Sequence, residues 1–253
     1  MGASFQASGP RDADRRNNRP APDSLKNMIH CLGGRVLQPE ILDTLPPEIA
    51  RPNLVDLARI NRRWGGYSTL RRLIGHAIPE GESFTLLDIG AASGDMGEQI
   101  RALRPGARVT SLDYIPWHLE KCTGDRVAAD AFALPFPPRS FDYVFSSLFL
   151  HHFTDDEIVR LLRTFGEVAR KGVLTIDLLR HPIPYYFISK TTWLLGWHPV
   201  SVSDGAISVE AAFKQDELTT LAQRAGLRNP SARTYMPAFR IALWTGATDD
   251  ISN

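Results

Sequence analysis

The segment that most constrains the fold of this chain is an apolar run that ends in small residues and continues as a polar, helix-forming stretch. Residues 84–89 (FTLLDI) predict a buried strand, and the next five residues, 90–94 (GAASG), predict a tight turn. A helix is expected from Ser93 to about Leu103. The small residues let a ligand approach the backbone, and the first N–H groups of the helix point toward it. This order predicts a nucleotide-type site at the carboxyl end of a sheet.

The spacing of the small residues distinguishes between kinds of nucleotide site. The dinucleotide fingerprint G-x-G-x-x-G would place a small residue at position 95, where the chain has Asp95. The pattern present is instead D-x-G-x-A-x-G, formed by Asp88, Gly90, Ala92 and Gly94. It resembles motif I of the class I methyltransferases that use S-adenosyl-L-methionine (SAM), with Ala in place of the usual middle Gly.

Two further strands are expected to end in carboxylates. Residues 109–113 (VTSLD) predict a short strand ending at Asp113, nineteen residues after Gly94, about where a ribose-binding acid follows a glycine-rich turn. Such a carboxylate can accept hydrogen bonds from both ribose hydroxyls. Residues 126–132 predict a third strand with an acid near its end, and the resemblance implies that Asp130 and Ala131 hold the adenine.

Residues 134–152 (LPFPPRSFDYVFSSLFLHH) closely resemble a stretch of the small-molecule and quinone-type methyltransferases. The four segments occur in the family's order and spacing, and the resemblance covers roughly residues 83–246. It implies SAM as the cofactor and a SAM site made of Asp88, Gly90, Ala91, Ala92, Gly94, Asp113, Tyr114, Asp130, Ala131 and Ser147.

Alternating strands and helices predict an α/β fold, a Rossmann-like, doubly wound and mostly parallel sheet. The resemblance implies seven strands with an antiparallel last hairpin, preceded by N-terminal helices. Residues 1–25 are polar and predict a disordered tail. Residues 26–80 are expected to form a helical cap, in which Trp64 or Tyr67 either line the site or pack in the core. Residues 81–253 are expected to form the SAM-binding domain, with an acceptor lid at about 178–213.

Composition excludes several classes of function. The formal net charge of +1 offers no broad attraction to nucleic acid. The two cysteines, Cys31 and Cys122, form no cluster with metal-ligand spacing, so we expect no metal site and a cytoplasmic location. No apolar run reaches about 18 residues, the least that a membrane span requires. The expected partner is a small-molecule acceptor, and the sequence leaves the oligomeric state open.

A histidine pair at the end of the fourth expected strand suits the chemistry of a hydroxyl acceptor. A phenol has a pKa of about 10, so its methylation gains from a general base, a role that histidine fills. In an extended chain His151 and His152 would point in opposite directions, so one of them faces the pocket, and we favour His152. His181 is the other candidate. The alternative is that the pair only fixes the turn by hydrogen bonds.

The aromatic segment that follows the fifth expected strand predicts the acceptor pocket, with Tyr185, Tyr186, Asp204 and Ser208 as substrate-binding residues. It resembles a stretch of bacterial methyltransferases encoded beside type III polyketide synthases. The alternative is that these aromatic residues belong to ordinary core.

The resemblance therefore implies a methyltransferase acting on a small, fairly apolar acceptor, most readily a phenol or enol oxygen of a polyketide-like compound. The alternatives are carbon methylation of a quinone-like ring and a SAM-binding protein without catalysis.

Overall fold

We analysed a computed structural model of the chain, which describes residues 33–38, 55, 58–184, 205 and 207–246. The expected tail (residues 1–25) and most of the expected lid, including Tyr185, Tyr186 and Asp204, lie outside these residues.

A seven-stranded sheet forms the centre of the molecule, in the order β3-β2-β1-β4-β5-β7-β6. The first five strands are parallel to one another, whereas β7 pairs antiparallel with both β5 and β6. The predicted Rossmann-like sheet with an antiparallel last hairpin is confirmed. The strands are β1 (Phe84–Ile89), β2 (Ala107–Asp113), β3 (Arg126–Ala128), β4 (Phe141–Ser147), β5 (Ala169–Leu178), β6 (Ser231–Tyr235) and β7 (Arg240–Gly246).

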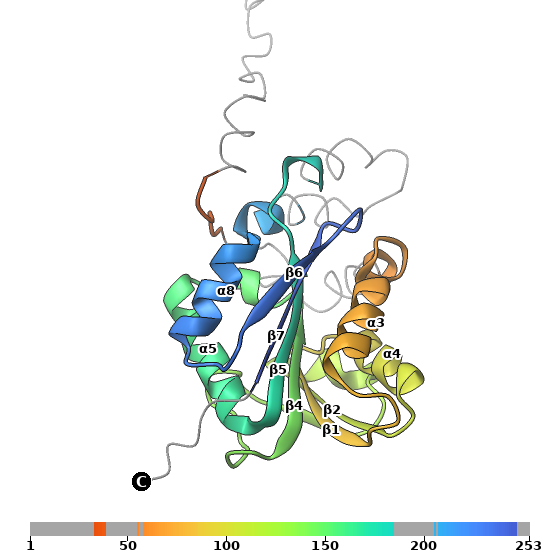
Figure 1. Cartoon of the computed structure of the whole chain (residues 1–253). Helices are drawn as coiled ribbons and strands as arrows, with labels where there is room; N and C mark the ends of the chain where they lie inside the picture. The colour runs from red at the N-terminus through yellow and green to blue at the C-terminus, as the bar shows by residue number, and fades with distance from the viewer. Residues whose placement is uncertain (1–32, 39–54, 56–57, 185–204, 206, 247–253) are drawn as a thin grey trace, which may run out of the picture.

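Helices cover both faces of this sheet (Figure 1). On one face α3 (Gly66–Ala77) and α4 (Asp95–Leu103) enclose a core that includes Leu70, Ile100 and Phe145. On the other face α5 (Asp155–Val168) and α8 (Gln215–Arg224) enclose a second core. Two short 3-10 helices, η2 (Pro116–Lys121) and η3 (Leu150–His152), follow β2 and β4.

The helix α5 forms where the sequence provides a cap and an apolar stripe. The Thr154 hydroxyl accepts a hydrogen bond from the backbone N–H of Glu157, and the Glu157 carboxylate accepts one from the backbone N–H of Thr154. These two N–H groups have no carbonyl partner within the helix, so this capping box satisfies both of them. Its apolar side chains, at spacings of three and four, are buried between the helix and the sheet: Ile158, Leu161, Leu162, Phe165 and Val168.

Two sequence expectations about element boundaries are wrong. The helix after the glycine-rich turn begins at Asp95, because Gly94 has a left-handed backbone and serves as its N-cap. The strand expected over 126–132 ends at Ala128, where its pairing with β2 stops.

Candidate active site

The turn between β1 and α4 requires glycine at two positions. Gly90 and Gly94 have positive φ angles of 68° and 74°, and Ala92 has one of 46°. A Cβ atom at Gly90 would lie 2.6 Å from the Phe149 ring, and one at Gly94 would lie 2.7 Å from the Cys122 sulfur. The backbone of this turn therefore lies close against the loops that follow β2 and β4, which places three strand ends at one edge of the sheet.

Asp88, the penultimate residue of β1, is a buried carboxyl group behind this turn. Its side chain faces the first turn of α4, where the backbone N–H of Gly97 stabilises the charged form. Burial and the neighbouring Asp95 charge outweigh that stabilisation and raise the pKa of Asp88 from 3.8 to about 8. Among the described residues its Oδ2 atom has no hydrogen-bond partner.

Asp113 joins the end of β2 to the glycine-rich turn. Its Oδ2 atom accepts a hydrogen bond from the Ala92 backbone at 3.0 Å, and its Oδ1 atom accepts one from the Ile115 backbone at 2.9 Å. The Nδ1 atom of His118 lies 3.1 Å from Oδ1. A carboxylate offers about four acceptor positions, so about one is left for an external donor. The adjacent Tyr114 is 74% exposed beside it.

The expected adenine-binding residues follow β3 in a turn rather than in the strand. Asp130 is exposed, and its carboxylate accepts a hydrogen bond from the Phe132 backbone at 2.9 Å. Ala131 is buried in the core cluster on the α5 side. At the end of β4, Ser147 is half-buried, and its hydroxyl has no partner among the described residues.

The expectation that His151 and His152 point in opposite directions is wrong. Both belong to the 3-10 helix η3 rather than to an extended strand, and their rings stack with centroids 4.3 Å apart. His151 is buried and His152 is exposed. The sequence reasoning assumed that the strand continues, whereas Leu148 has a positive φ of 52° that turns the chain at that point.

His151 forms a buried pair with Asp177 of β5, a residue that the sequence analysis did not select. Its Nδ1 atom lies 2.6 Å from Oδ1 of Asp177, and Oδ2 accepts a hydrogen bond from the Leu150 backbone at 3.0 Å. Burial alone would raise the pKa of Asp177, but the hydrogen bond from His151, and the positive charge of that ring once it is protonated, outweigh burial and lower this pKa. An ionised Asp177 holds the proton of His151 on Nδ1, so Nε2 is the nitrogen that can accept another.

Arg35, also missed from the sequence, connects the N-terminal part of the chain to this pair. Its guanidinium donates to the backbone carbonyls of His151 and Phe153, at 3.3 and 2.9 Å, and to that of Ala211 at 2.8 Å. It also forms an ion pair with Asp155 at 2.5 Å. The backbone N–H of Val36 donates to the carbonyl oxygen of Glu210. We call residues 33–38 the strap, because they are bonded both to the segment of His151 and to the segment of Glu210.

The remaining expected site residues have contacts of their own. The Nδ1 atom of His181 accepts a hydrogen bond from the Ile183 backbone at 3.2 Å, and its ring packs against Phe239. Ser208 is buried in the helical stretch 207–211, next to the strap. Tyr67 donates a hydrogen bond to Asp95 at 3.1 Å, whereas Trp64 is 37% exposed.

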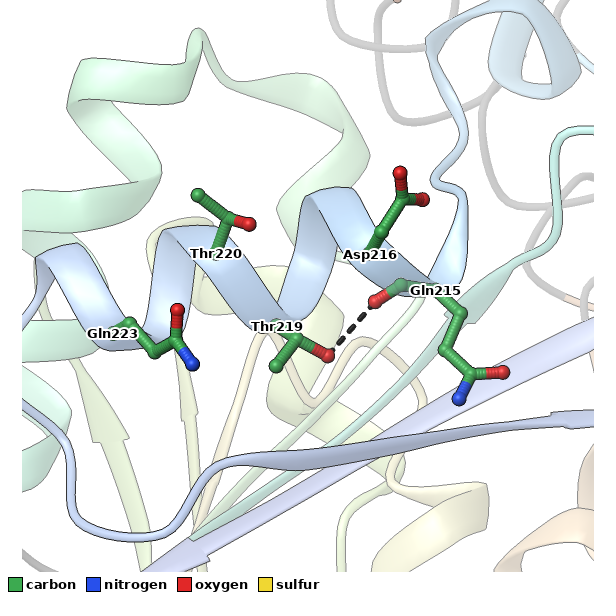
Figure 2. Close-up of a pocket in the computed structure, with 5 residues that line it drawn as sticks. All are labelled: Gln215, Asp216, Thr219, Thr220 and Gln223. Carbon is green, nitrogen blue, oxygen red and sulfur yellow. Dashed lines mark hydrogen bonds between the residues drawn. The ribbon is translucent and has the colours of Figure 1, made fainter.

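A polar depression on the outer side of α8 is separate from this edge of the sheet. Figure 2 shows its lining side chains, which are polar and all belong to α8: Gln215, Asp216, Thr219, Thr220 and Gln223. Among the described residues, no helix is long and apolar enough to cross a membrane. In the same ranges no three His, Cys, Asp or Glu side chains gather where they could hold a metal ion.

Comparison with known proteins points to one class of domain. Residues 87–176 match the family model described as "Methyltransferase domain". No curated protein matches the chain by sequence.

Solved structures share the fold at low sequence identity. A putative O-methyltransferase from Nostoc punctiforme is 18% identical, with 88% of this chain and 68% of that chain covered and a TM-score of 0.58. A SAM-dependent methyltransferase from Aquifex aeolicus is 13% identical, with coverage of 78% and 98% and a TM-score of 0.56. The mitomycin 7-O-methyltransferase is 21% identical, with coverage of 77% and 60% and a TM-score of 0.53. With its matched domain and its strand order, the chain is an enzyme of the SAM-dependent methyltransferase type, class I in fold.

Proposed function

We propose that the chain transfers a methyl group from SAM to a phenol or enol oxygen of a small, fairly apolar acceptor, with polyketide-like compounds as the first candidates. The observation that carries this proposal is the buried His151–Asp177 pair at the carboxyl ends of β4 and β5. In open α/β sheets, ligands bind at that edge. The names of two structural neighbours, both O-methyltransferases, agree with an oxygen acceptor.

The turn and its neighbours fit the proposed cofactor. Gly90 and Gly94 keep the backbone free of side chains where a ligand approaches, and Asp113 retains about one acceptor position for a ribose hydroxyl. We assign the adenine to Asp130 and Ala131 on the resemblance stated above. When bound, SAM supplies an electrophilic methyl group on a positively charged sulfur.

The protein's own contribution to the chemistry is proton removal and alignment. With Asp177 holding the proton on Nδ1, Nε2 of His151 takes the proton of the acceptor hydroxyl, which makes the oxygen a better nucleophile. Such a base contributes about 10²- to 10⁴-fold to a rate. This assignment moves the proposed base from His152 to His151, because His151 has an orienting carboxylate.

Isotopically methyl-labelled SAM and a panel of phenols, pyrones and quinones test this function. Mass spectrometry then identifies the acceptor and the atom that is methylated. We expect label on oxygen, with loss of about 10²-fold or more in kcat for His151→Ala and Asp177→Asn and unchanged SAM affinity. His152→Ala is the matched control, with a much smaller effect. Label on ring carbon contradicts oxygen methylation, and full activity of His151→Ala removes that histidine from the mechanism.

A further inference from the structure

Arg240, the first residue of β7, is a buried arginine whose Nε atom has no hydrogen-bond partner among the described residues. The residue is 4% exposed, and among the described residues its side chain forms no hydrogen bond or ion pair. Burial lowers the pKa of Arg240 to about 10, although the Asp177 charge opposes the shift, so the group stays charged at neutral pH. Its buried Nε–H has no acceptor, and a buried polar group left without a partner costs free energy. The position therefore calls for a partner from outside the described residues.

Arg240 lies at the edge of the sheet that the proposed base occupies. It pairs with Leu178, the last residue of β5, and Asp177 is the neighbouring residue on that strand. Tyr235, opposite Arg240 on β6, belongs to the core on the α3 side, so Arg240 projects to that face. Asp177 projects to the other face, where its partner Ile241 joins the α5 core. Arg240 and the His151–Asp177 pair thus flank the same strand ends from opposite faces.

Two other buried arginines of the described chain show how such groups are usually accommodated. Arg180 donates to the carbonyls of Ala212 and Gly33 and forms an ion pair with Glu217. Arg35 donates to three carbonyls and one carboxylate. Both guanidinium groups have partners within the chain, so the lack of them at Arg240 is a property of that site rather than of buried arginines in this fold.

We propose that Arg240 binds a carboxylate of the acceptor at the strand ends that it shares with the His151–Asp177 pair. The inference rests on the proposed function and narrows its substrate class to acidic phenols or enols. The planar guanidinium matches the two oxygens of a carboxylate in a bidentate pair, which a neutral quinone cannot offer.

Binding of salicylate and its neutral counterpart salicylamide tests this site directly. Calorimetry and thermal shift are measured on the full chain with S-adenosylhomocysteine present. We expect salicylate to bind about tenfold more tightly or better, since a charge-assisted pair is involved, and to raise Tm more. Arg240→Met abolishes that preference, and Arg240→Lys keeps part of it, because it retains the charge without the planar fork.

Stability of the ligand-free variants distinguishes a binding residue from a structural one. Arg240→Met removes an unpaired buried charge, so its Tm stays equal to that of the unmodified protein or rises. The matched control, Arg180→Met, breaks a paired buried charge, so its Tm falls. A large fall in Tm for Arg240→Met would mean that Arg240 holds the fold together, and the proposal fails.

Binding and methylation separate the two proposals. Equal affinity for both compounds, no binding of either, or a salicylate preference that survives in Arg240→Met overturns the carboxylate site. Methylation of salicylamide with no role for Arg240 leaves oxygen methylation in place and removes only this site. Binding of salicylate that depends on Arg240, together with label found only on ring carbons of the panel, supports the site and contradicts oxygen methylation.

Discussion

At the scale of single residues, the aspartates at the strand ends differ in burial, hydrogen bonding and pKa, although their positions in the sequence are similar. Asp88 is buried behind the turn with a raised pKa, Asp113 is tied to two backbone N–H groups, and Asp177 is ionised beside a histidine. The pattern of small residues predicted the first two as site residues. Asp177 was missed because its partner His151 comes from another strand end, and that pairing is set by the order of the strands.

Asp113→Asn should weaken SAM binding. The change removes the negative charge from the one acceptor position left for a ribose hydroxyl. A hydrogen bond to a charged group is worth about 1.5–3 kcal/mol, so we expect a loss of about tenfold or more in affinity by calorimetry. Asp125→Asn, an exposed loop position before β3, removes the same charge and should leave affinity unchanged. Equal affinities for all three proteins would refute the ribose assignment.

The raised pKa of Asp88 predicts how stability depends on pH. Its folded-state pKa of about 8 lies above the ordinary 3.8, so between these values the folded chain binds a proton more tightly than the unfolded chain. The free energy of unfolding therefore loses this contribution as pH rises from 3.8 to about 8. Asp88→Asn cannot ionise, so its Tm relative to the unmodified protein should increase over that window in ligand-free thermal melts. Parallel Tm curves would contradict the raised pKa.

At the scale of elements, local sequence signals account for the helices α5 and α8 but not for the loops. The Thr154 capping box marks the start of α5, and Gly226 follows the end of α8. The turn at Leu148 and the short helix η3 depend on contacts with β5, such as the Leu148 N–H bond to Ile176, so nothing within 134–152 indicated them. The strap contains no periodic pattern, and its role depends on partners far along the chain.

Arg35→Met tests the strap as a support for η3. The variant leaves carbonyls of His151, Phe153 and Ala211 without this donor, and each unsatisfied buried group costs about 1–3 kcal/mol. We expect Tm to fall by several degrees and kcat to fall while SAM affinity is kept. Asp155→Asn is the control, since it removes only the ion pair of an exposed carboxylate, and such pairs contribute about 1 kcal/mol at most. If the Tm of Asp155→Asn fell as far as that of Arg35→Met, the loss of stability would come from the ion pair rather than from the carbonyl contacts.

At the scale of the whole molecule, the resemblance and the alternation of strands and helices predicted a doubly wound, mostly parallel sheet of seven strands with an antiparallel last hairpin, as observed. The placement of the N-terminal part was not predictable in the same way. Residues 33–38 contact segments around positions 151–155 and 207–213, and no local pattern specifies contacts between such distant parts of a chain.

Two truncations test the proposed division of the chain. Deleting residues 2–25, the expected tail, should leave Tm, SAM affinity and kcat unchanged. Deleting residues 2–38 also removes the strap and should reproduce the losses of Arg35→Met. Both are measured by thermal melts, calorimetry and labelled methyl transfer. Equal loss from the shorter deletion would show that the first 25 residues belong to the folded domain.

The bonds of Arg35 have a consequence for the order in which the chain becomes active during synthesis. Arg35 leaves the ribosome 176 residues before its partner Ala211. Closing so long a loop is entropically costly and comes after nearer contacts have formed. The histidine proposed as the base therefore reaches its supported position only after Ala211 has been synthesised, and a nascent chain that ends before Ala211 should not turn over substrate at the full rate.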